Sequence, residues 1–205
     1  MFDTIQAAPP DAILGLTEAF RADKNPDKIN LSVGVYKDEA GGTPLLDSVR
    51  AAGQRVIEDQ GSKAYLPIDG APAYASAVQA LMFGADHEVV TSDRAATSHT
   101  PGGTGGLRVA ADFIHQNLPQ ATVWLTDPTW PNHPGIFAAA GVPTKTIPYF
   151  DAETNGLAFD AALAAVKKIP AGDVLLLHGC CHNPTGIDPT ADQWEQLAAA
   201  VRAGG

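Results

Sequence analysis

Apolar side chains recur every three to four positions in the first part of the chain, which is the period of an amphipathic helix. The stripes predict helices over residues 11–22, 45–60 and 72–83. Gly61 and Gly84 follow the last two stripes and predict their C-terminal ends. Between the first two stripes, the apolar and β-branched residues 28–36 predict an extended segment that Gly34 interrupts.

From residue 95 onwards, short apolar runs alternate with helical stripes. The runs predict strands over residues 95–99, 121–126, 142–147 and 173–178. The stripes predict helices over residues 107–118, 136–140, 159–166 and 190–201. The last helix opens on the capping box Thr190-x-x-Gln193, and the run 173–178 is typical of a strand buried on both faces. This alternation predicts an α/β fold, a mostly parallel sheet with helices on both faces.

The composition is that of an ordinary globular protein, with 205 residues of which 45% are hydrophobic and 18% charged, so disorder is disfavoured. The 13 Lys and Arg residues against 23 Asp and Glu give a net charge of −10. Nucleic acids and anionic membranes are bound through a basic surplus, so we expect neither as a partner. No apolar run approaches the ~18 residues that a membrane-spanning helix needs.

The start of the chain and its cysteines indicate the compartment. The first residues carry Asp3 and no basic cluster, so they do not have the pattern of a signal peptide. The only cysteines, Cys180 and Cys181, are adjacent and cannot staple a loop with a disulfide. We therefore expect a cytoplasmic protein.

Three loops that follow predicted strands are rich in glycine, proline and polar residues, namely 100–106, 127–133 and 178–186. Ligands of open parallel sheets bind beyond the carboxyl ends of the strands. These three loops are therefore the candidate site.

The loop 100–106, TPGGTGG, precedes a helix and has the features of a phosphate cradle, although a tight strand-to-helix turn would look the same. Glycines let backbone N–H groups approach an oxyanion, and the helix dipole favours negative charge there. The loop is no Walker A motif, and Arg108 departs from the dinucleotide fingerprint. Asp127 does lie about 20 residues further on, as that fingerprint requires, so a Rossmann-like dinucleotide binder is an alternative.

Trp130 lies in the proline-bounded loop DPTWPNH, where a stiff backbone could hold the indole as a stacking platform for a flat cofactor. A tryptophan packed into the core is the commoner case. His133 closes the same loop and is by itself a structural residue more often than a functional one.

The loop 178–186, HGCCHNPTG, is the densest polar cluster of the chain. A metal site is disfavoured because zinc ligands come in spaced pairs, whereas Cys180 and Cys181 are neighbours. Nothing in the sequence marks either thiol as an activated nucleophile. Asn183-Pro184 indicates a turn that presents an amide to a ligand, or an Asx turn that caps its own backbone.

Two residues of the first part of the chain are further candidates. Gly34 removes a side chain from an apolar stretch, which fits close approach of a ligand or a plain β-bulge. Tyr65 lies in a loop bounded by proline and glycine, where its hydroxyl could reach an anion, although a core or surface tyrosine is more common.

Five motifs in this order resemble the pyridoxal-phosphate-dependent aminotransferases of class I and fold type I, in particular the aspartate and aromatic amino acid group. The motifs are INLSVGVYKDE, YLPIDG, TPGGTGGLRVAADF, DPTWPNH and HGCCHNPTGIDPT. The resemblance covers the whole chain and outweighs the metal and dinucleotide interpretations, each of which uses a single motif.

The resemblance implies pyridoxal 5'-phosphate as cofactor and a role for each matched residue. The cofactor phosphate would be held by Gly102, Gly103 and Thr104, and by Tyr65 from the partner subunit of a homodimer. Trp130 would stack on the pyridine ring, and Asn183 would bind its phenolic oxygen. Gly34, with Trp130 and Asn183, would meet the substrate. The family also has cis peptide bonds at the positions of Asp127-Pro128 and Asn183-Pro184.

The resemblance further implies an amino acid aminotransferase for aspartate, aromatic amino acids or both, with 2-oxoglutarate as the 2-oxo acid. None of the seven lysines matches the family's Schiff-base lysine, so no catalytic residue is expected here and the chain alone should be inactive. We expect an N-terminal fragment. Residues 1–44 would be an arm and part of the small domain, and residues 45–205 an incomplete cofactor-binding large domain. A non-catalytic chain that binds a phosphate-bearing ligand is the alternative from another class.

Overall fold

The computed structural model describes residues 14–29 and 34–204. The chain divides into two units, Met1–Tyr65 and Leu66–Gly205. The expected boundary at residue 44 is not tested by this division and stays a prediction.

The first unit contains two helices, α1 (Leu14–Ala22) and α2 (Asp47–Asp59), which confirms the helices expected there. Residues 11–13 of the first prediction lie outside the described residues. The expected extended segment also lies partly outside them, and its residues 34–36 form no strand. No side chain of α2 is buried, and its apolar residues Val49 and Val56 are exposed.

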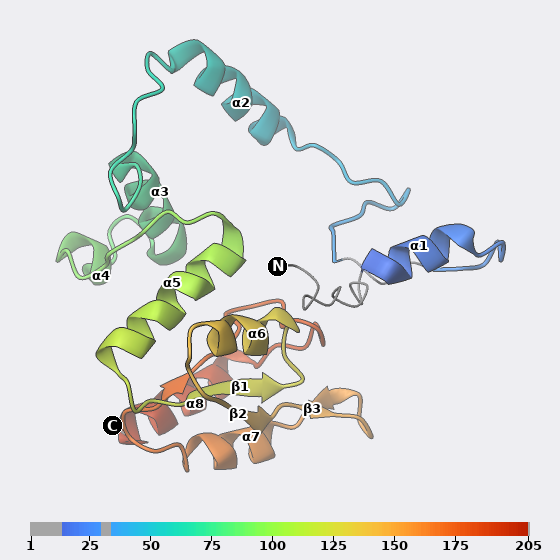
Figure 1. The fold of residues 1–205 in the computed structure, drawn as a ribbon, viewed down its shortest axis with the longest axis vertical. Helices are drawn as coiled ribbons and strands as arrows, with labels where there is room; N and C mark the ends of the chain where they lie inside the picture. The colour runs from blue at the N-terminus through green and yellow to red at the C-terminus, as the bar shows by residue number, and fades with distance from the viewer. Residues whose placement is uncertain (1–13, 30–33, 205) are drawn as a thin grey trace, which may run out of the picture. The chain divides into compact units, whose positions relative to one another are not determined.

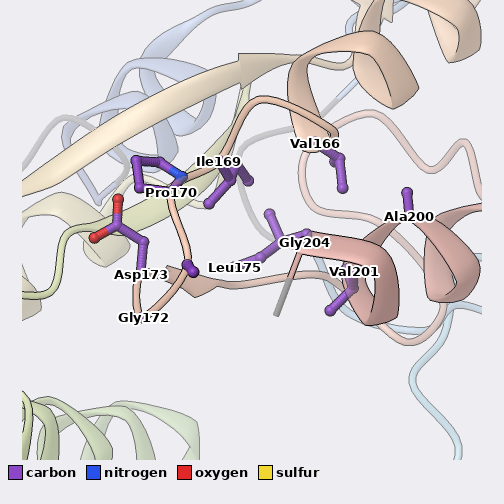
Figure 2. A pocket seen from close by; sticks show the side chains of 10 residues that line it. Val166, Ile169, Pro170, Gly172, Asp173, Leu175, Ala200, Val201 and Gly204 are labelled. Carbon is purple, nitrogen blue, oxygen red and sulfur yellow. The ribbon is translucent and has the colours of Figure 1, made fainter.

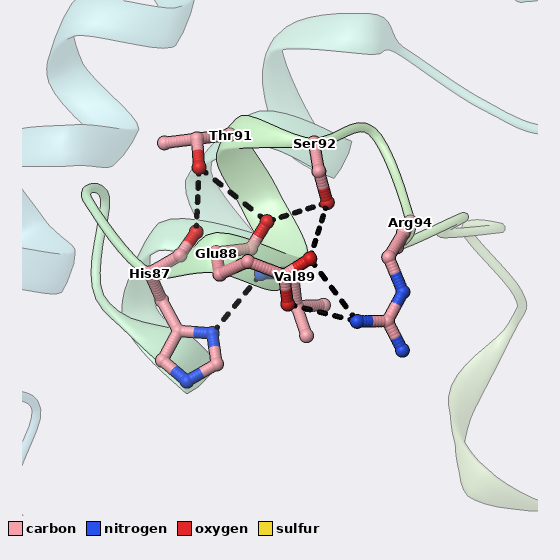
Figure 3. Close-up of polar contacts among 6 residues, drawn as sticks. All are labelled: His87, Glu88, Val89, Thr91, Ser92 and Arg94. Atoms are coloured by element: carbon pink, nitrogen blue, oxygen red, sulfur yellow. Dashed lines mark hydrogen bonds and ion pairs between the residues drawn. The ribbon is translucent and has the colours of Figure 1, made fainter.

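The second unit begins with α3 (Pro72–Phe83), which ends at Gly84 as expected. The short helix α4 (Glu88–Thr91) follows and had no clear signal in the sequence. Figure 3 shows the polar contacts around α4. His87 Nδ1, at its start, accepts a hydrogen bond from Val89 N at 3.2 Å, and Arg94, which follows it, forms an ion pair with Glu88 at 2.8 Å. All of these polar groups are satisfied locally.

The sheet of the second unit consists of β1 (Val123–Asp127), β2 (Thr144–Pro148) and β5 (Val174–Leu175), in the order β2-β1-β5. Figure 1 labels β1 and β2. Both pairs are parallel, with Val123 opposite Thr144 on one side and opposite Val174 on the other. The predicted α/β class with a parallel sheet is confirmed.

Helices cover both faces of this sheet, as predicted. They are α5 (Gly102–Asn117), α6 (Asn132–Ala139), α7 (Phe159–Val166) and α8 (Ala191–Gly204). Val123 and Leu125 of β1 pack with α5 and α6 in one apolar cluster, whereas Trp124 packs with α7 and α8 in the other. Successive side chains of a strand point to opposite faces of the sheet, so those of β1 contribute alternately to the two apolar clusters.

Two predicted strands were wrong or too long. Residues 95–99 form no strand, because their polar groups are met elsewhere: Gln79 Nε2 donates to Ala95 O at 3.0 Å, and His99 N donates to Asp69 O at 2.8 Å. The run 173–178 gives only the two residues of β5. β5 is half-buried rather than buried on both faces, since β1 is its only neighbour in the described part of the chain.

A small antiparallel hairpin, β3 (Phe150–Asp151) and β4 (Gly156–Leu157), was not predicted from the sequence. Residues 152–155 connect its strands, and Asn155, directly before β4, adopts a φ of 51°. The predicted capping box is confirmed, with Thr190 N donating to Gln193 Oε1 at 2.9 Å and Gln193 N to Thr190 Oγ1 at 3.3 Å.

Asp173 lies at the amino end of the sheet, directly before β5. Its carboxylate accepts hydrogen bonds from Thr122 N and Trp124 Nε1, both at 2.8 Å. A cavity of about 80 Å³ lies beside it, between the end of α7, the start of β5 and the end of α8 (Figure 2). Asp173 is the only charged residue that lines the cavity, and its carboxylate already accepts the two hydrogen bonds from Thr122 and Trp124. No helix of the described residues is long and apolar enough to cross a membrane.

Candidate functional site

The glycine-rich segment is helical from Gly102 onwards, which corrects the expectation of a loop over 100–106. Gly102 has a φ of +72°, a left-handed conformation that favours glycine. A Cβ added at Gly102 or at Gly103 would meet nothing within 4 Å, so the backbone is bare on that side. Gly102 N donates a hydrogen bond to Thr100 O at 2.8 Å. The next N–H groups of the first turn have no carbonyl four residues earlier in the helix, and Pro101 provides no side-chain cap.

Two features bear on where this helix terminus lies relative to the sheet. Residues 118–122 connect the end of α5 to the amino end of β1, so the first turn of α5 is the end of the helix that lies farther from this connection. Leu107, one turn into α5, packs on the same apolar cluster as Trp130. We therefore expect Gly102, Gly103 and Thr104 at the end of the sheet that also carries the tryptophan, and their role stays a prediction.

The segment entering α5 is fixed by contacts to the loop before α3. Gly70 is buried with a φ of +97°, and a Cβ there would lie 2.4 Å from His99 Cβ. The ring of His99 stacks on Tyr74, with 4.1 Å between the ring centroids. Only glycine at position 70 permits this approach.

Trp130 is half-buried, so it lies between the two alternatives expected from the sequence, a tryptophan packed into the core and an accessible stacking platform. It packs on the cluster formed by α5, β1 and α6, and the His133 ring meets it edge to face at a centroid distance of 5.3 Å. His133 is itself only 4% exposed, and its Nδ1 lies 2.7 Å from Thr129 Oγ1. The indole is thus held in one orientation while part of its surface remains accessible.

A row of three histidines, His133, His178 and His182, extends from Trp130 across the carboxyl ends of β1 and β5. Ring centroids are 5.3 Å apart between His133 and His178, and 4.3 Å between His178 and His182. Burial is the main cause that lowers the pKa of each ring, and neighbouring imidazoles lower that of His133 and His182 further. The buried Nδ1 of His178 has no hydrogen-bond partner within the described residues.

His182 connects the end of β1 to the turn that follows β5. Its Nε2 lies 2.9 Å from Thr126 Oγ1, and its Nδ1 lies 2.8 Å from Thr185 Oγ1. The Tyr149 ring stacks on it at 3.9 Å, and the Tyr149 hydroxyl donates to Ile187 O at 2.6 Å. Burial lowers the pKa of His182 to about 4 and raises the pKa of Tyr149 to about 12, so both rings are neutral at pH 7.

Asn183 is exposed, and its amide makes no hydrogen bond to the described residues, so the Asx-turn alternative is not what the structure shows. The Asp188 carboxylate fixes the backbone before it, by accepting from Cys181 N at 2.7 Å and from His182 N at 2.9 Å. These bonds to the charged form are the main reason that the pKa of Asp188 is lowered. The amide of Asn183 is therefore presented by a rigid turn and remains available.

The peptide bonds Asp127-Pro128 and Asn183-Pro184 are both cis, as the resemblance implied. Cys180 and Cys181 are free and exposed. In the part of the chain that the structure describes, no three His, Cys, Asp or Glu side chains are arranged to hold a metal ion.

Gly34 and Tyr65 belong to the first unit, and their roles stay predictions. An added Cβ at Gly34 would meet nothing within 4 Å, and the Tyr65 side chain is fully exposed.

In the second unit, one apolar cluster connects α5 to Trp130, and ring contacts through His133 and His178 connect Trp130 to His182, the neighbour of Asn183. That the expected residues form one site stays a prediction.

Four residues that support the site were not predicted from the sequence, namely Thr126, Tyr149, His182 and Asp188. Thr126 ends an apolar run, and Asp188 lies five positions after Asn183, whose turn it helps to fix. A strand-end position was the one available signal for Thr126, and the contacts of the others depend on the folded geometry.

Comparison with known proteins places these motifs in one family. A model of the aminotransferase class I and II family matches residues 26–205. The aspartate aminotransferase of Salmonella typhi is 53% identical over 198 residues, which is 97% of this chain and 50% of that protein.

Solved structures agree with this match. An aromatic amino acid aminotransferase from Burkholderia cenocepacia J2315 has a TM-score of 0.94 at 48% identity, covering 100% of this chain and 51% of its own. The aromatic-amino-acid aminotransferase from Burkholderia pseudomallei, solved covalently bound to pyridoxal phosphate, has a TM-score of 0.93 at 45% identity with the same coverage. The chain spans about half the length of these relatives. The matches favour the aminotransferase interpretation over the dinucleotide-binding and non-catalytic alternatives, and the chain belongs to the class I and II aminotransferase family.

Proposed function

We propose that the carboxyl end of this sheet holds pyridoxal 5'-phosphate, and that the chain supplies the cofactor-facing part of an amino acid aminotransferase. Three features of the second unit, which we assign to one end of the sheet, support the proposal: a helix N-terminus without a side-chain cap, a half-buried indole, and an amide that makes no hydrogen bond to the described residues. The residues present fit the cofactor, since they offer an anion site, an aromatic face and a hydrogen-bond donor.

The α5 terminus would hold the phosphate through the N–H groups at Gly103 and Thr104, with the helix dipole adding favourable potential. Trp130, held in place by His133, would cover one face of the pyridine ring. The Asn183 amide would donate to the phenolic oxygen and favour its charged form. When bound, pyridoxal phosphate supplies a conjugated ring that accepts the electrons released at the Cα of an amino acid.

The lysines of the second unit support the proposal that this chain alone is inactive. Lys145 lies over the Trp124 ring at 5.1 Å, near the amino end of β2, and Lys167 and Lys168 lie in the connection that enters β5. All three are at the opposite end of the sheet from Trp130 and Asn183. None is placed to attach the cofactor or to move a proton at Cα.

We propose amino acids and 2-oxo acids as substrates, with aspartate, aromatic amino acids or both as donors, because relatives named for each of these activities match the chain. We further propose a cytoplasmic homodimer, supported by the exposed Tyr65 and by the two free cysteines. Tyr65 would then reach the phosphate bound by the partner subunit.

Fluorescence tests the proposal with Trp130 as the only reporter, after Trp124→Phe and Trp194→Phe. Pyridoxal phosphate is expected to quench this fluorescence in a saturable way, and inorganic phosphate is expected to compete. Asn183→Ala should weaken binding, whereas Asn117→Ala, on the exposed last turn of α5, should not. Equal quenching of a variant that retains Trp194 in place of Trp130 would contradict the proposal.

A further inference from the structure

Two adjacent thiols lie in the turn that presents Asn183. Cys180 and Cys181 are both free and exposed, and they are the only cysteines of the chain. Each therefore has the other as its sole intramolecular thiol partner. The proposed aminotransferase chemistry uses neither of them.

The fold holds the two residues in a fixed arrangement. Cys181 has a φ of +53°, in the left-handed region, and its N–H is bound by Asp188 Oδ2 at 2.7 Å. The thiol of Cys180 is the main cause that raises the pKa of Cys181, which is consistent with side chains that approach each other. The turn is closed on its other side by Gly186 N, which donates to His182 O at 2.6 Å.

We propose that Cys180 and Cys181 form a vicinal dithiol site that a small disulfide of the glutathione type oxidises to an intrachain disulfide. The Cys180 thiolate attacks one sulfur of the small disulfide and releases the first small thiolate. The Cys181 thiolate then attacks the Cys180 sulfur of the mixed disulfide and releases the second. The two protein thiols lose two protons and two electrons, which the two released small thiols carry away.

We assign the first attack to Cys180 because the Asp188 carboxylate lies beside Cys181, with Oδ2 2.7 Å from Cys181 N. The Cys180 thiol and this carboxylate raise the pKa of Cys181 and so disfavour its thiolate, the attacking form. The product is strained, since consecutive Cα atoms are about 3.8 Å apart and disulfides usually join Cα atoms more than about 4.4 Å apart. A strained disulfide is easily reduced, so the modification is reversible by ordinary monothiols. Closing the ring resets the backbone two residues before Asn183.

Denaturing mass spectrometry of the full chain tests this site after incubation with oxidised glutathione. The expected product is a chain lighter by two hydrogens, with the new bond mapped to one peptide, and reduced glutathione restores the original mass. Cys181→Ser should instead keep one glutathione on Cys180, and Cys180→Ser should acquire its adduct more slowly. The urea-unfolded chain should close the ring more slowly than the folded chain.

Three results would overturn the inference: glutathione adducts that persist on the unsubstituted chain, disulfide-linked dimers, or equal closure rates in the folded and unfolded chains. None of these readouts depends on pyridoxal phosphate. Failure of this inference therefore leaves the proposed cofactor site untouched, and the reverse also holds.

Discussion

Single side chains fix the geometry of the candidate site through contacts that are mostly buried and neutral. His182 lies within hydrogen-bond distance of Thr126 at the end of β1 and of Thr185 in the turn after β5. Its ring stacks on Tyr149, whose hydroxyl donates a hydrogen bond to the carbonyl of Ile187. Neutral imidazoles can lie side by side without charge repulsion, which is why the histidine row can be largely buried at the carboxyl end of the sheet. The polar groups that face the proposed ligand are left free.

Tyr149→Phe should lower the free energy of unfolding by about 1 kcal/mol, because the Ile187 carbonyl loses its hydrogen bond while the stacked ring stays in place. Urea denaturation measures the change. Tyr74→Phe is the matched control, since Tyr74 also stacks on a histidine and its hydroxyl makes no hydrogen bond to the described residues. Equal effects of the two substitutions would show that the Tyr149 hydroxyl contributes nothing.

Gly103→Ala should weaken binding of pyridoxal phosphate without loss of stability. The added methyl group has free space in the fold but would occupy the face that we assign to the phosphate. Alanine in a helix is favoured over glycine by roughly 0.5–1 kcal/mol, so the free energy of unfolding should rise slightly. Gly53→Ala in α2, where a Cβ is also unobstructed, should leave binding unchanged. Unchanged binding by Gly103→Ala would argue against the phosphate site.

Helices and strands follow local sequence signals wherever residues close in sequence determine the structure of the element. The capping box of α8 is an example, because Thr190 and Gln193 satisfy each other's backbone N–H groups without help from distant residues.

Thr190→Ala should therefore destabilise the chain by about 1 kcal/mol, through loss of the hydroxyl that accepts from Gln193 N. Thermal or urea unfolding measures the effect. Thr190→Ser keeps the hydroxyl and should recover most of the stability; if it is as destabilising as alanine, the cap is not the cause.

The limits of sequence-based prediction are also clearest for elements. Most helices were predictable because their stripes and glycine stops are local. Residues 95–99 have a strand-like pattern, but their hydrogen bonds go to Asp69 and to the side chain of Gln79, which no local pattern reveals. The same holds for the site: the glycines, Trp130 and Asn183 stand out in the sequence, whereas His182 gains its role only through the fold.

The molecule as a whole concentrates its core in one part of the chain. Every buried hydrophobic side chain of the described residues lies between Ala111 and Ala200. The apolar side chains of α2 and α3 are exposed or half-buried by comparison. The stability of the chain therefore depends on the sheet, its four covering helices and the histidine row at the carboxyl ends of the strands.

The histidine row should make this stability depend on pH. The folded pKa values of His133, His178 and His182 lie below 6.5, that of His182 at about 4. Between 6.5 and about 4 the unfolded chain binds more protons, so stability is complete above pH 6.5 and is lost as the pH falls. Each histidine contributes a slope of at most about 1.4 kcal/mol per pH unit.

Urea denaturation at several pH values measures this slope. His182→Gln, which retains an amide near the Thr126 hydroxyl, should reduce the slope, whereas His115→Gln on the exposed side of α5 should not. A stability that is constant from pH 7 to pH 4.5 would contradict the buried, neutral state of the row.

The most direct test of the central claim is a map of amide chemical shifts as pyridoxal phosphate is added to the isotope-labelled chain. We predict saturable shifts of the backbone amides of Gly102, Gly103 and Thr104, the indole N–H of Trp130 and the side-chain amide of Asn183, all with one dissociation constant. Shifts confined to the surroundings of Lys145, Lys167 and Lys168 would place the cofactor at the wrong end of the sheet. That result, or displacement by NAD of a ligand bound at the glycine turn, would contradict the account.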